Sequence, residues 1–105
     1  MLVEIRRYTI KPGRRGEFVQ FFHAEVLPAM EAAGMRILGV YVGAEDSQTF
    51  FYLRGFDSAE EREGQLDAFY QGSEWLGGLR DRALAMEESF HVELVRTAVP
   101  SEQTT

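Results

Sequence analysis

The amino-acid sequence predicts an α+β fold in which strands and helices follow the order βαββαβ. Apolar residues alternate with a period of two in four segments, which is typical of strands. Between them, apolar residues recur at steps of three and four, which is typical of amphipathic helices. The length of 105 residues corresponds to one domain, which we place at residues 1–98, followed by a flexible polar tail at residues 99–105.

The first half of the chain opens with a strand predicted at residues 2–10, because β-branched and aromatic residues alternate there with polar ones. A helix is predicted at residues 14–33, where apolar residues keep helical spacing, and Gly34 suits a left-handed cap at its end. Pro28 removes one backbone donor inside this helix and predicts a kink near residues 24–28.

The middle of the chain is predicted to form an antiparallel hairpin over residues 35–43 and 49–56, both rich in Val, Ile, Tyr and Phe. Ser58 and Glu61 then form a capping box, which predicts that a second helix begins there. The cap is expected to be reciprocal, with the Glu61 carboxylate accepting from the backbone N–H of Ser58 itself.

The last part of the chain continues that helix to Gly72, after which Ser73 can cap a further helical stretch. Gly77 and Gly78 weaken this stretch locally. Alternation returns at residues 88–95 and predicts a fourth strand. This order is the ferredoxin-like arrangement, one four-stranded antiparallel sheet with its helices packed on a single face.

The opposite face of that sheet is expected to need a cover. The aliphatic side chains suit packing against the helices, whereas the aromatic and charged ones are expected on the uncovered face. This second set includes Glu4, Arg6, Tyr8, Tyr41, Tyr52 and Arg54. So many exposed rings would exceed the apolar patch that a soluble monomer usually tolerates. A second copy of the chain is the simplest cover, so we expect a homodimer whose two sheets form a barrel-like sandwich.

Composition excludes several classes of function. The net charge of −6 disfavours nucleic acid as a partner, because nucleic-acid binding depends on positive charge. The absence of cysteine excludes disulfides, thiolate chemistry and cysteine metal sites. No apolar run approaches 18 residues, and the start of the chain lacks the order of a signal peptide. We therefore expect a cytoplasmic protein without membrane contact.

Several short segments carry a family resemblance over roughly residues 2–98. They are Glu4–Gly13, Glu17-Phe18, Glu25–Pro28, Leu38–Tyr41 and Gly72–Trp75. Together they resemble a NIPSNAP-type protein, a group within the dimeric α+β barrel superfamily. The resemblance implies a ferredoxin-like protomer, a homodimer formed through the sheet face, and a cavity within the barrel or between sheet and helices. Members of that family tend to carry a His-x-Trp arrangement in the strand at residues 49–56, where this chain has Tyr52 and Arg54.

Glu4, Arg6 and Tyr8 lie two residues apart along one strand and therefore point to the same side. With the tyrosines and Arg54 of the neighbouring strands, they predict a polar and aromatic cluster inside the dimer. One interpretation is a ligand pocket in which arginine holds a carboxylate or enolate and tyrosines donate hydrogen bonds. The other is a self-satisfied buried ion pair with tyrosines filling volume. Trp75 is either a core side chain or a lid over the pocket.

His23 and His91 are the two imidazoles of the chain. His91 shares a strand face with Glu93 and is a possible general base, although a surface contact is the more common role of such a pair. His23 is expected to be a partly exposed helix residue. Neither belongs to a set of converging ligands, so we expect no metal site and no cofactor.

These observations favour a homodimer that binds a small hydrophobic or aromatic metabolite. The alternative is a cofactor-independent monooxygenase or isomerase that uses tyrosine and arginine to stabilise an enolate. A scaffold dimer without a ligand is a third possibility.

Overall fold

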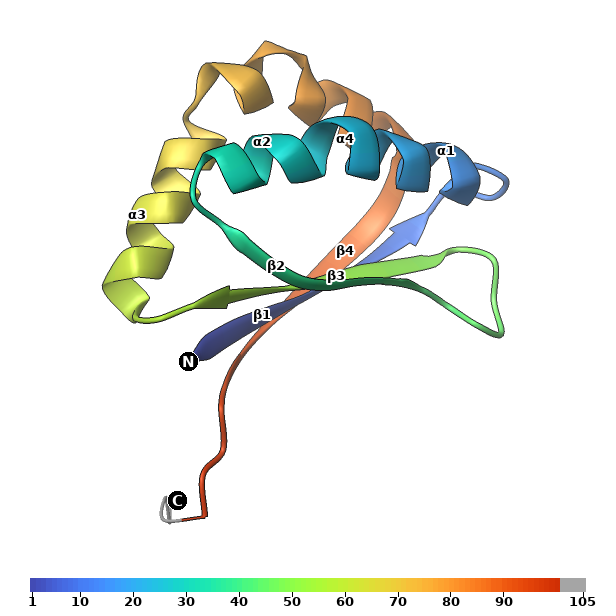
Figure 1. The fold of residues 1–105 in the computed structure, drawn as a ribbon. Helices are drawn as coiled ribbons and strands as arrows, with labels where there is room; N and C mark the ends of the chain where they lie inside the picture. The colour runs from blue at the N-terminus through green and yellow to red at the C-terminus, as the bar shows by residue number, and fades with distance from the viewer. Residues whose placement is uncertain (101–105) are drawn as a thin grey trace.

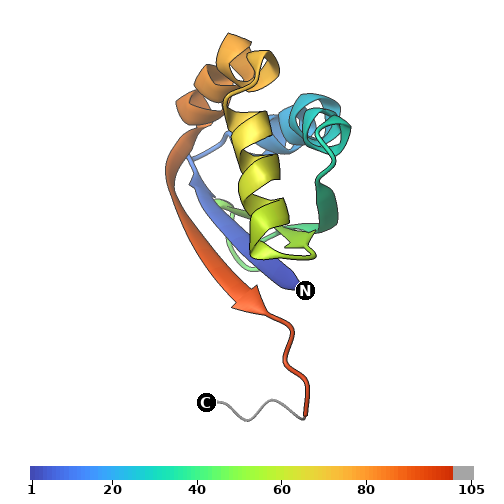
Figure 2. The ribbon, with the colours of Figure 1, turned by 90° about the vertical axis from the view of Figure 1, so that its left-hand side faces the viewer.

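The structure, a computed structural model, describes residues 1–100, so most of the predicted tail at residues 99–105 lies outside the described residues. Four strands form one antiparallel sheet with the order β2-β3-β1-β4. They are β1 (Leu2–Ile10), β2 (Arg36–Val42), β3 (Thr49–Phe56) and β4 (Glu87–Arg96). All helices lie on one side of this sheet, and its other side is bare (Figures 1 and 2). The predicted α+β, ferredoxin-like arrangement is therefore confirmed.

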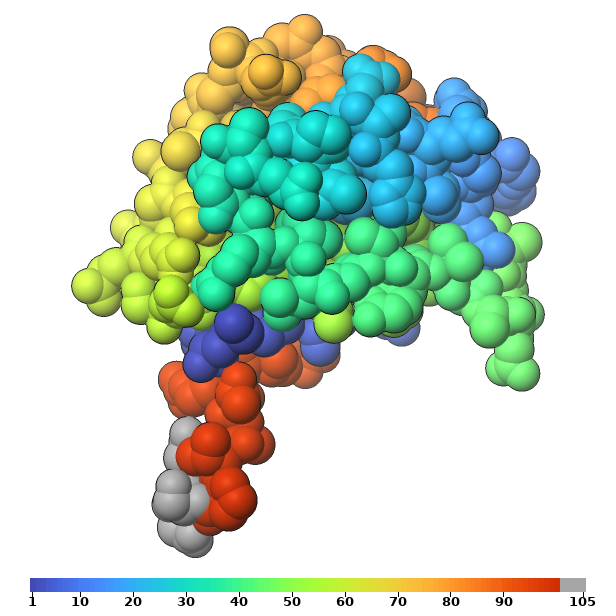
Figure 3. Space-filling model, in the orientation of Figure 1, coloured from blue at the N-terminus to red at the C-terminus, as the bar shows by residue number. Residues whose placement is uncertain are grey.

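The helical layer contains four α-helices and two π-helical segments. In chain order they are α1 (Arg15–Phe21), η1 (Phe22–Val26), α2 (Leu27–Ala32), α3 (Ala59–Tyr70), η2 (Trp75–Leu79) and α4 (Arg80–Met86). The atoms of α2 rest directly on those of β2 (Figure 3), and α1 contacts β3. Among the described residues, no helix has the length and apolarity needed to cross a bilayer.

The first helical unit is irregular where Pro28 predicts a kink, because a π-helical turn lies there. The π-helical turn η1 ends two residues before this proline, and the backbone stays helical from η1 into α2, so the helix continues past the position that lacks an N–H. Gly34 ends the unit with a φ of 89°, and the Met35 N–H donates to the Met30 carbonyl oxygen at 3.0 Å. This is the glycine-capped ending that the sequence predicts.

The Ser58 cap of α3 is present, with the Ser58 hydroxyl accepting from the Glu61 N–H at 3.0 Å. The reciprocal half differs from expectation, because the Glu61 carboxylate accepts from the Asp57 N–H rather than from that of Ser58. The carboxylate thus reaches one residue further toward the N-terminus and still satisfies a backbone donor at the start of the helix.

The predicted assignment of the two sheet faces is wrong. The aromatic and charged set lies beneath the helices, with Glu4 and Arg54 fully buried and Tyr52 only 3% exposed. These charges can lie in the core because they pair with one another, while Phe22 and Met30 from the helical layer pack on the tyrosine rings. The aliphatic residues Val3, Ile5 and Leu53 of β1 and β3 are therefore on the bare side.

Tyr41 is separated from this set by a β-bulge. The register between β2 and β3 shifts between Ile37 and Gly39, which reverses the alternation of the residues that follow. Tyr41 consequently points to the bare side, where it is 47% exposed and stacks on Phe51 with ring centroids 5.0 Å apart.

The bare face of the sheet combines apolar side chains with a few polar ones. Strand pairing places Val3 beside Val95, Ile5 beside Leu53, and Arg7 between Phe51 and His91. Leu38 and Tyr41 extend the apolar area along β2, each nearly half exposed. An uncovered apolar area is thus present, as predicted, but it is built from different side chains.

Candidate functional site

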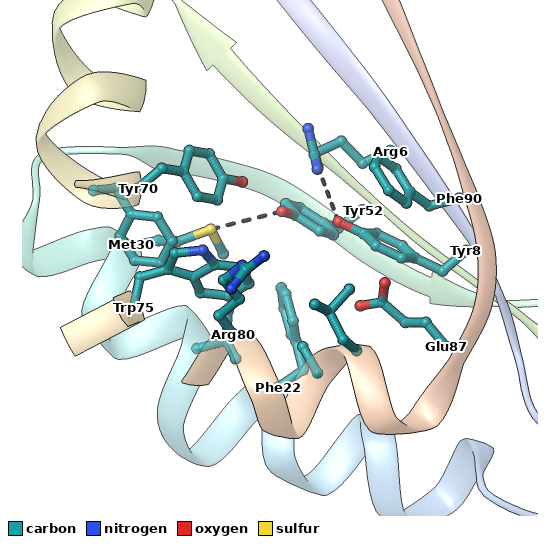
Figure 4. A pocket seen from close by; sticks show the side chains of 14 residues that line it. Arg6, Tyr8, Phe22, Met30, Tyr52, Tyr70, Trp75, Arg80, Glu87 and Phe90 are labelled. Atoms are coloured by element: carbon teal, nitrogen blue, oxygen red, sulfur yellow. Dashed lines mark hydrogen bonds between the residues drawn. The ribbon is translucent and has the colours of Figure 1, made fainter. Parts of the chain in front are cut away.

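A cavity of about 240 Å³ lies between the sheet and the helices (Figure 4). Its lining comes from β1, β3, β4 and every helical element except α1. The residues are Arg6, Tyr8, Phe22, Val26, Met30, Tyr52, Phe69, Tyr70, Trp75, Arg80, Ala83, Leu84, Glu87 and Phe90. The inner lining is buried, whereas Arg80, Leu84 and Phe90 are exposed. The mouth therefore lies between α4 and the edge strand β4.

A buried ion network forms the polar base of the site. One Glu4 oxygen accepts from Arg54 Nε at 2.7 Å and from Arg6 at 3.4 Å, and the other accepts from Arg62 Nε at 2.6 Å. Burial alone would raise the pKa of Glu4, but the three guanidinium groups outweigh it and hold this pKa below 4.5. Three cations surround one carboxylate, so an otherwise acidic chain concentrates positive charge beside the cavity.

Two arginines of this network donate hydrogen bonds to tyrosine hydroxyls beside the cavity. Arg6 Nε donates to the Tyr8 hydroxyl at 3.0 Å, and Arg54 donates to the hydroxyls of Tyr70 at 3.0 Å and Tyr52 at 3.4 Å. Burial raises the pKa of both Tyr8 and Tyr52, which keeps these phenols protonated. The Tyr8 hydroxyl, which accepts from Arg6, keeps its own proton for donation to a ligand, whereas the Tyr52 hydroxyl donates its proton to the Met30 sulfur at 3.7 Å. The site can therefore donate hydrogen bonds to an electron-rich oxygen.

Aromatic rings form the walls. Tyr8 and Tyr52 lie nearly parallel, with centroids 6.1 Å apart, and Phe22 packs 4.8 Å from Tyr52. On the helical side, Trp75 lies 5.3 Å from Tyr70 in an edge arrangement. Such a cavity fits a flat, apolar group with one polar end.

Glu87 is the one carboxylate in the lining, and its carboxylate points into the cavity in Figure 4. The register between β1 and β4 shifts at the end of β1, so that Ile10 pairs with Glu87 and Thr9 with Ser89. Because Ile10 faces the helices, this bulge turns Glu87 toward them as well. Burial raises the pKa of Glu87 to about 7, an effect that Arg6 partly opposes.

The site residues predicted from the sequence lie in three places: the cavity wall, the ion network behind it, and positions outside the cavity. Arg6, Tyr8, Tyr52 and Trp75 line the cavity. Glu4 and Arg54 are the support behind it, as in the self-satisfied ion-pair interpretation. Trp75 is half-buried against the core and also forms part of the cavity wall.

Tyr41 and His91 do not belong to the cavity. His91 lies on the bare face, in a shallow depression with Arg7 and Glu93, and is exposed. His23 is exposed on η1, as expected. Within residues 1–100, no three His, Asp or Glu side chains converge as metal ligands.

Tyr70, Arg80 and Glu87 were not predicted as site residues. Tyr70 and Arg80 stand in helical stretches whose orientation over the sheet cannot be derived from periodicity. Glu87 precedes the predicted strand and reaches the cavity only through the bulge at the end of β1. Neither strand alone carries a sequence signal for this bulge, so periodicity could not identify Glu87.

Comparison with known proteins relates this chain to a family. The NIPSNAP family model matches residues 3–96. The structure of an uncharacterized NIPSNAP domain protein from Burkholderia xenovorans is similar, with a TM-score of 0.86 and 20% identity over 98% of this chain and 100% of that one. A protein from Agrobacterium tumefaciens has a TM-score of 0.87 and 17% identity, over 99% of this chain and 100% of its own.

A more distant similarity links the chain to a protein from Nitrosomonas europaea that is provisionally assigned as an antibiotic biosynthesis monooxygenase. The TM-score is 0.72 and the identity 14%, over 94% of this chain and 100% of that one. A search of curated proteins finds no match. Sequence identities this low establish a shared fold and carry no chemistry from one protein to another.

Proposed function

The chain belongs to the NIPSNAP family, and from this premise we propose that it acts as a homodimer in which each protomer binds a small aromatic metabolite between its sheet and its helices. The observation that carries the proposal is the cavity itself, which combines ring-bearing walls with arginine-supported tyrosine hydroxyls. Ligand sites are commonly apolar cavities with a few convergent polar groups.

The charged side chains around the cavity indicate which polar group the ligand carries. Arg6 and Arg80 line the cavity, and Arg54 acts through Tyr52 and Tyr70. A carboxylate, a phenolate or a ketone oxygen accepts hydrogen bonds from such donors, whereas an ammonium group would meet like charge. The volume of about 240 Å³ lies just below the usual range for ligand cavities, so the ligand is a single ring with a short substituent.

A thermal-shift screen tests ligand binding. Aromatic keto acids such as phenylpyruvate and benzoylformate should raise the melting temperature of the protein by mass action, and their cyclohexyl analogues should raise it less. Cyclohexylamine, which is cationic, serves as the control. If the cation stabilises the protein as well as the acids do, or if none of them does, the proposal is wrong.

The homodimer is supported by the bare sheet face. Ile5, Leu53 and Phe51 form its centre, in contact along neighbouring strands, and are only partly covered within one chain. A second copy pairing through the same face would bury them and form the dimeric α+β barrel.

Light scattering tests the assembly. The expected mass is twice the 12.0 kDa of one chain. Leu53→Arg places a charge at the centre of the bare face and should give the single-chain mass. Leu76→Arg, at a 55% exposed position on the helical side, should leave the dimer intact. A wild-type protein that scatters as a single chain at micromolar concentration contradicts the proposed dimer.

A cofactor-independent isomerase or monooxygenase is the second candidate. The specific observation that favours it is Glu87, a carboxylate inside the cavity with a pKa raised to about 7 by burial. Carboxylates whose pKa lies near neutral pH are typical of proton-transfer sites.

A further inference from the structure

We propose that Glu87 is a base that removes a proton from the carbon next to a carbonyl group of the bound ligand, so that the cavity supports keto–enol isomerisation. The inference rests on the proposed aromatic ligand and names its reactive group. It also assigns a chemical role to a side chain outside the predicted cluster.

The first support is the placement of Glu87. The β-bulge opposite Ile10 directs this side chain to the helix-covered side, and the carboxylate enters the cavity beside Tyr8 (Figure 4). The backbone at this junction is held in position, because the Met86 carbonyl oxygen accepts from the Lys11 N–H at 2.9 Å. Bulges commonly redirect one side chain in this way at functional sites.

The second support is that the carboxylate is free to react. Within residues 1–100, no hydrogen bond or ion pair holds the Glu87 oxygens, in contrast to Glu4, which is held by three arginines. The other charged or titratable side chains that line the cavity are Arg6, Tyr8, Tyr52, Tyr70 and Arg80. A carboxylate that faces the cavity without a protein partner is available to a ligand.

The third support is the complementary chemistry of the remaining lining. Tyr8 and Tyr52 hold their hydroxyls close to the middle of the cavity in Figure 4, each accepting from an arginine. A ligand carbonyl oxygen against Tyr8 receives a hydrogen bond that strengthens as the oxygen becomes an enolate. The Glu87 carboxylate approaches the same part of the cavity from β4. The ligand carbon next to the carbonyl can then lie between Glu87 and Tyr8.

The step is balanced without a further reactant. The C–H bond next to the carbonyl breaks, its proton forms an O–H bond with Glu87, and its electron pair becomes the double bond of the enolate. The proton then passes from Glu87 to the enolate oxygen, which gives the enol, or returns to the same carbon after exchange with solvent, which gives back the ketone; either path restores the carboxylate. Nothing is oxidised or reduced.

Phenylpyruvate is the probe for this step, because it has one ring, a carboxylate and an acidic benzylic carbon. Proton NMR in D₂O follows the loss of its benzylic signal, and the buffer rate is subtracted. The wild-type protein should accelerate this exchange, and its rate should rise with pH and level off above about 7. Glu87→Gln should lower the protein-dependent rate by about 100-fold or more, the usual contribution of a general base.

Two controls separate this inference from the proposed function. Glu88→Gln changes the neighbouring exposed carboxylate and should leave the exchange rate unchanged. Benzoylformate carries the same ring and keto acid but no exchangeable carbon-bound proton, and should bind wild type and Glu87→Gln alike. Failure of both acids to bind the wild type overturns the proposed function and the inference together. Binding without accelerated exchange, or exchange that survives Glu87→Gln, overturns the inference alone.

Discussion

Glu4→Gln is the substitution that most directly challenges the buried ion network. Glu4 is fully buried and is the common partner of Arg6, Arg54 and Arg62, of which Arg54 is also fully buried. Glutamine keeps the size of the side chain but removes the negative charge, which leaves the guanidinium groups uncompensated. Removing one partner of a buried pair costs about 3–5 kcal/mol. That is about a third to a half of the roughly 10 kcal/mol stability of an ordinary domain.

Urea denaturation followed by circular dichroism at a fixed protein concentration measures this cost, because dimerisation would make stability concentration-dependent. The matched control is Glu63→Gln on the exposed surface of α3, which should change the free energy of unfolding by less than about 0.5 kcal/mol. A Glu4→Gln cost below about 1 kcal/mol would show that the network is not buried as described.

The pH dependence gives a second check on the same substitution. The pKa of Glu4 in the folded protein lies below 4.5, its ordinary value, so the folded state holds this proton less tightly than the unfolded state does. The stability that Glu4 contributes is therefore complete above 4.5 and is lost as the pH falls through the lower folded-state value. The difference between wild type and Glu4→Gln should shrink on acidification. A difference independent of pH would contradict the assigned ion pairing.

Three further predictions follow from other parts of the molecule. The folded-state pKa of Glu87 is raised from 4.5 to about 7, so stability is lost as the pH rises between these values. Because solvent screens part of this effect at a partly exposed side chain, Glu87→Gln should stabilise the protein by about 2 kcal/mol at pH 8 and have no effect near pH 4 in urea denaturation. Arg6→Ala should keep the fold by circular dichroism but weaken benzoylformate binding at least tenfold by calorimetry, whereas a fully unfolded variant would show that Arg6 is structural. Ser58→Ala should lower the free energy of unfolding by about 1 kcal/mol through loss of the α3 cap, and restoration by Ser58→Asp would confirm the cause.

Much of the fold was predictable because it depends on local patterns. The strands at residues 2–10 and 49–56 match the structure, and the other two differ by one residue at each end. Pro28 and Gly34 have the effects that backbone chemistry requires of them. These features depend on a few neighbouring residues, which is the information a single sequence carries.

The candidate site was predictable only in part, because alternation defines two faces of a sheet without saying which one the helices cover. A buried pair of Glu4 with an arginine was one of the two interpretations of the sequence, but Glu4 is also held by Arg62, a residue 58 positions away that no local pattern connects to it. Two β-bulges then moved Tyr41 out of the site and Glu87 into it. A bulge is a property of two paired strands and has no signature in either strand alone.

Trp75 permits the most direct test of the account, since it is the one tryptophan of the chain and forms part of the cavity wall. Its fluorescence should change in a saturable manner as benzoylformate is added, and excess phenylpyruvate should compete with this change. The same titration of Leu53→Arg should remain saturable, because that substitution alters the opposite face of the sheet. A wild-type signal that changes only linearly with added acid, without saturation or competition, would contradict a ligand site between the sheet and the helices.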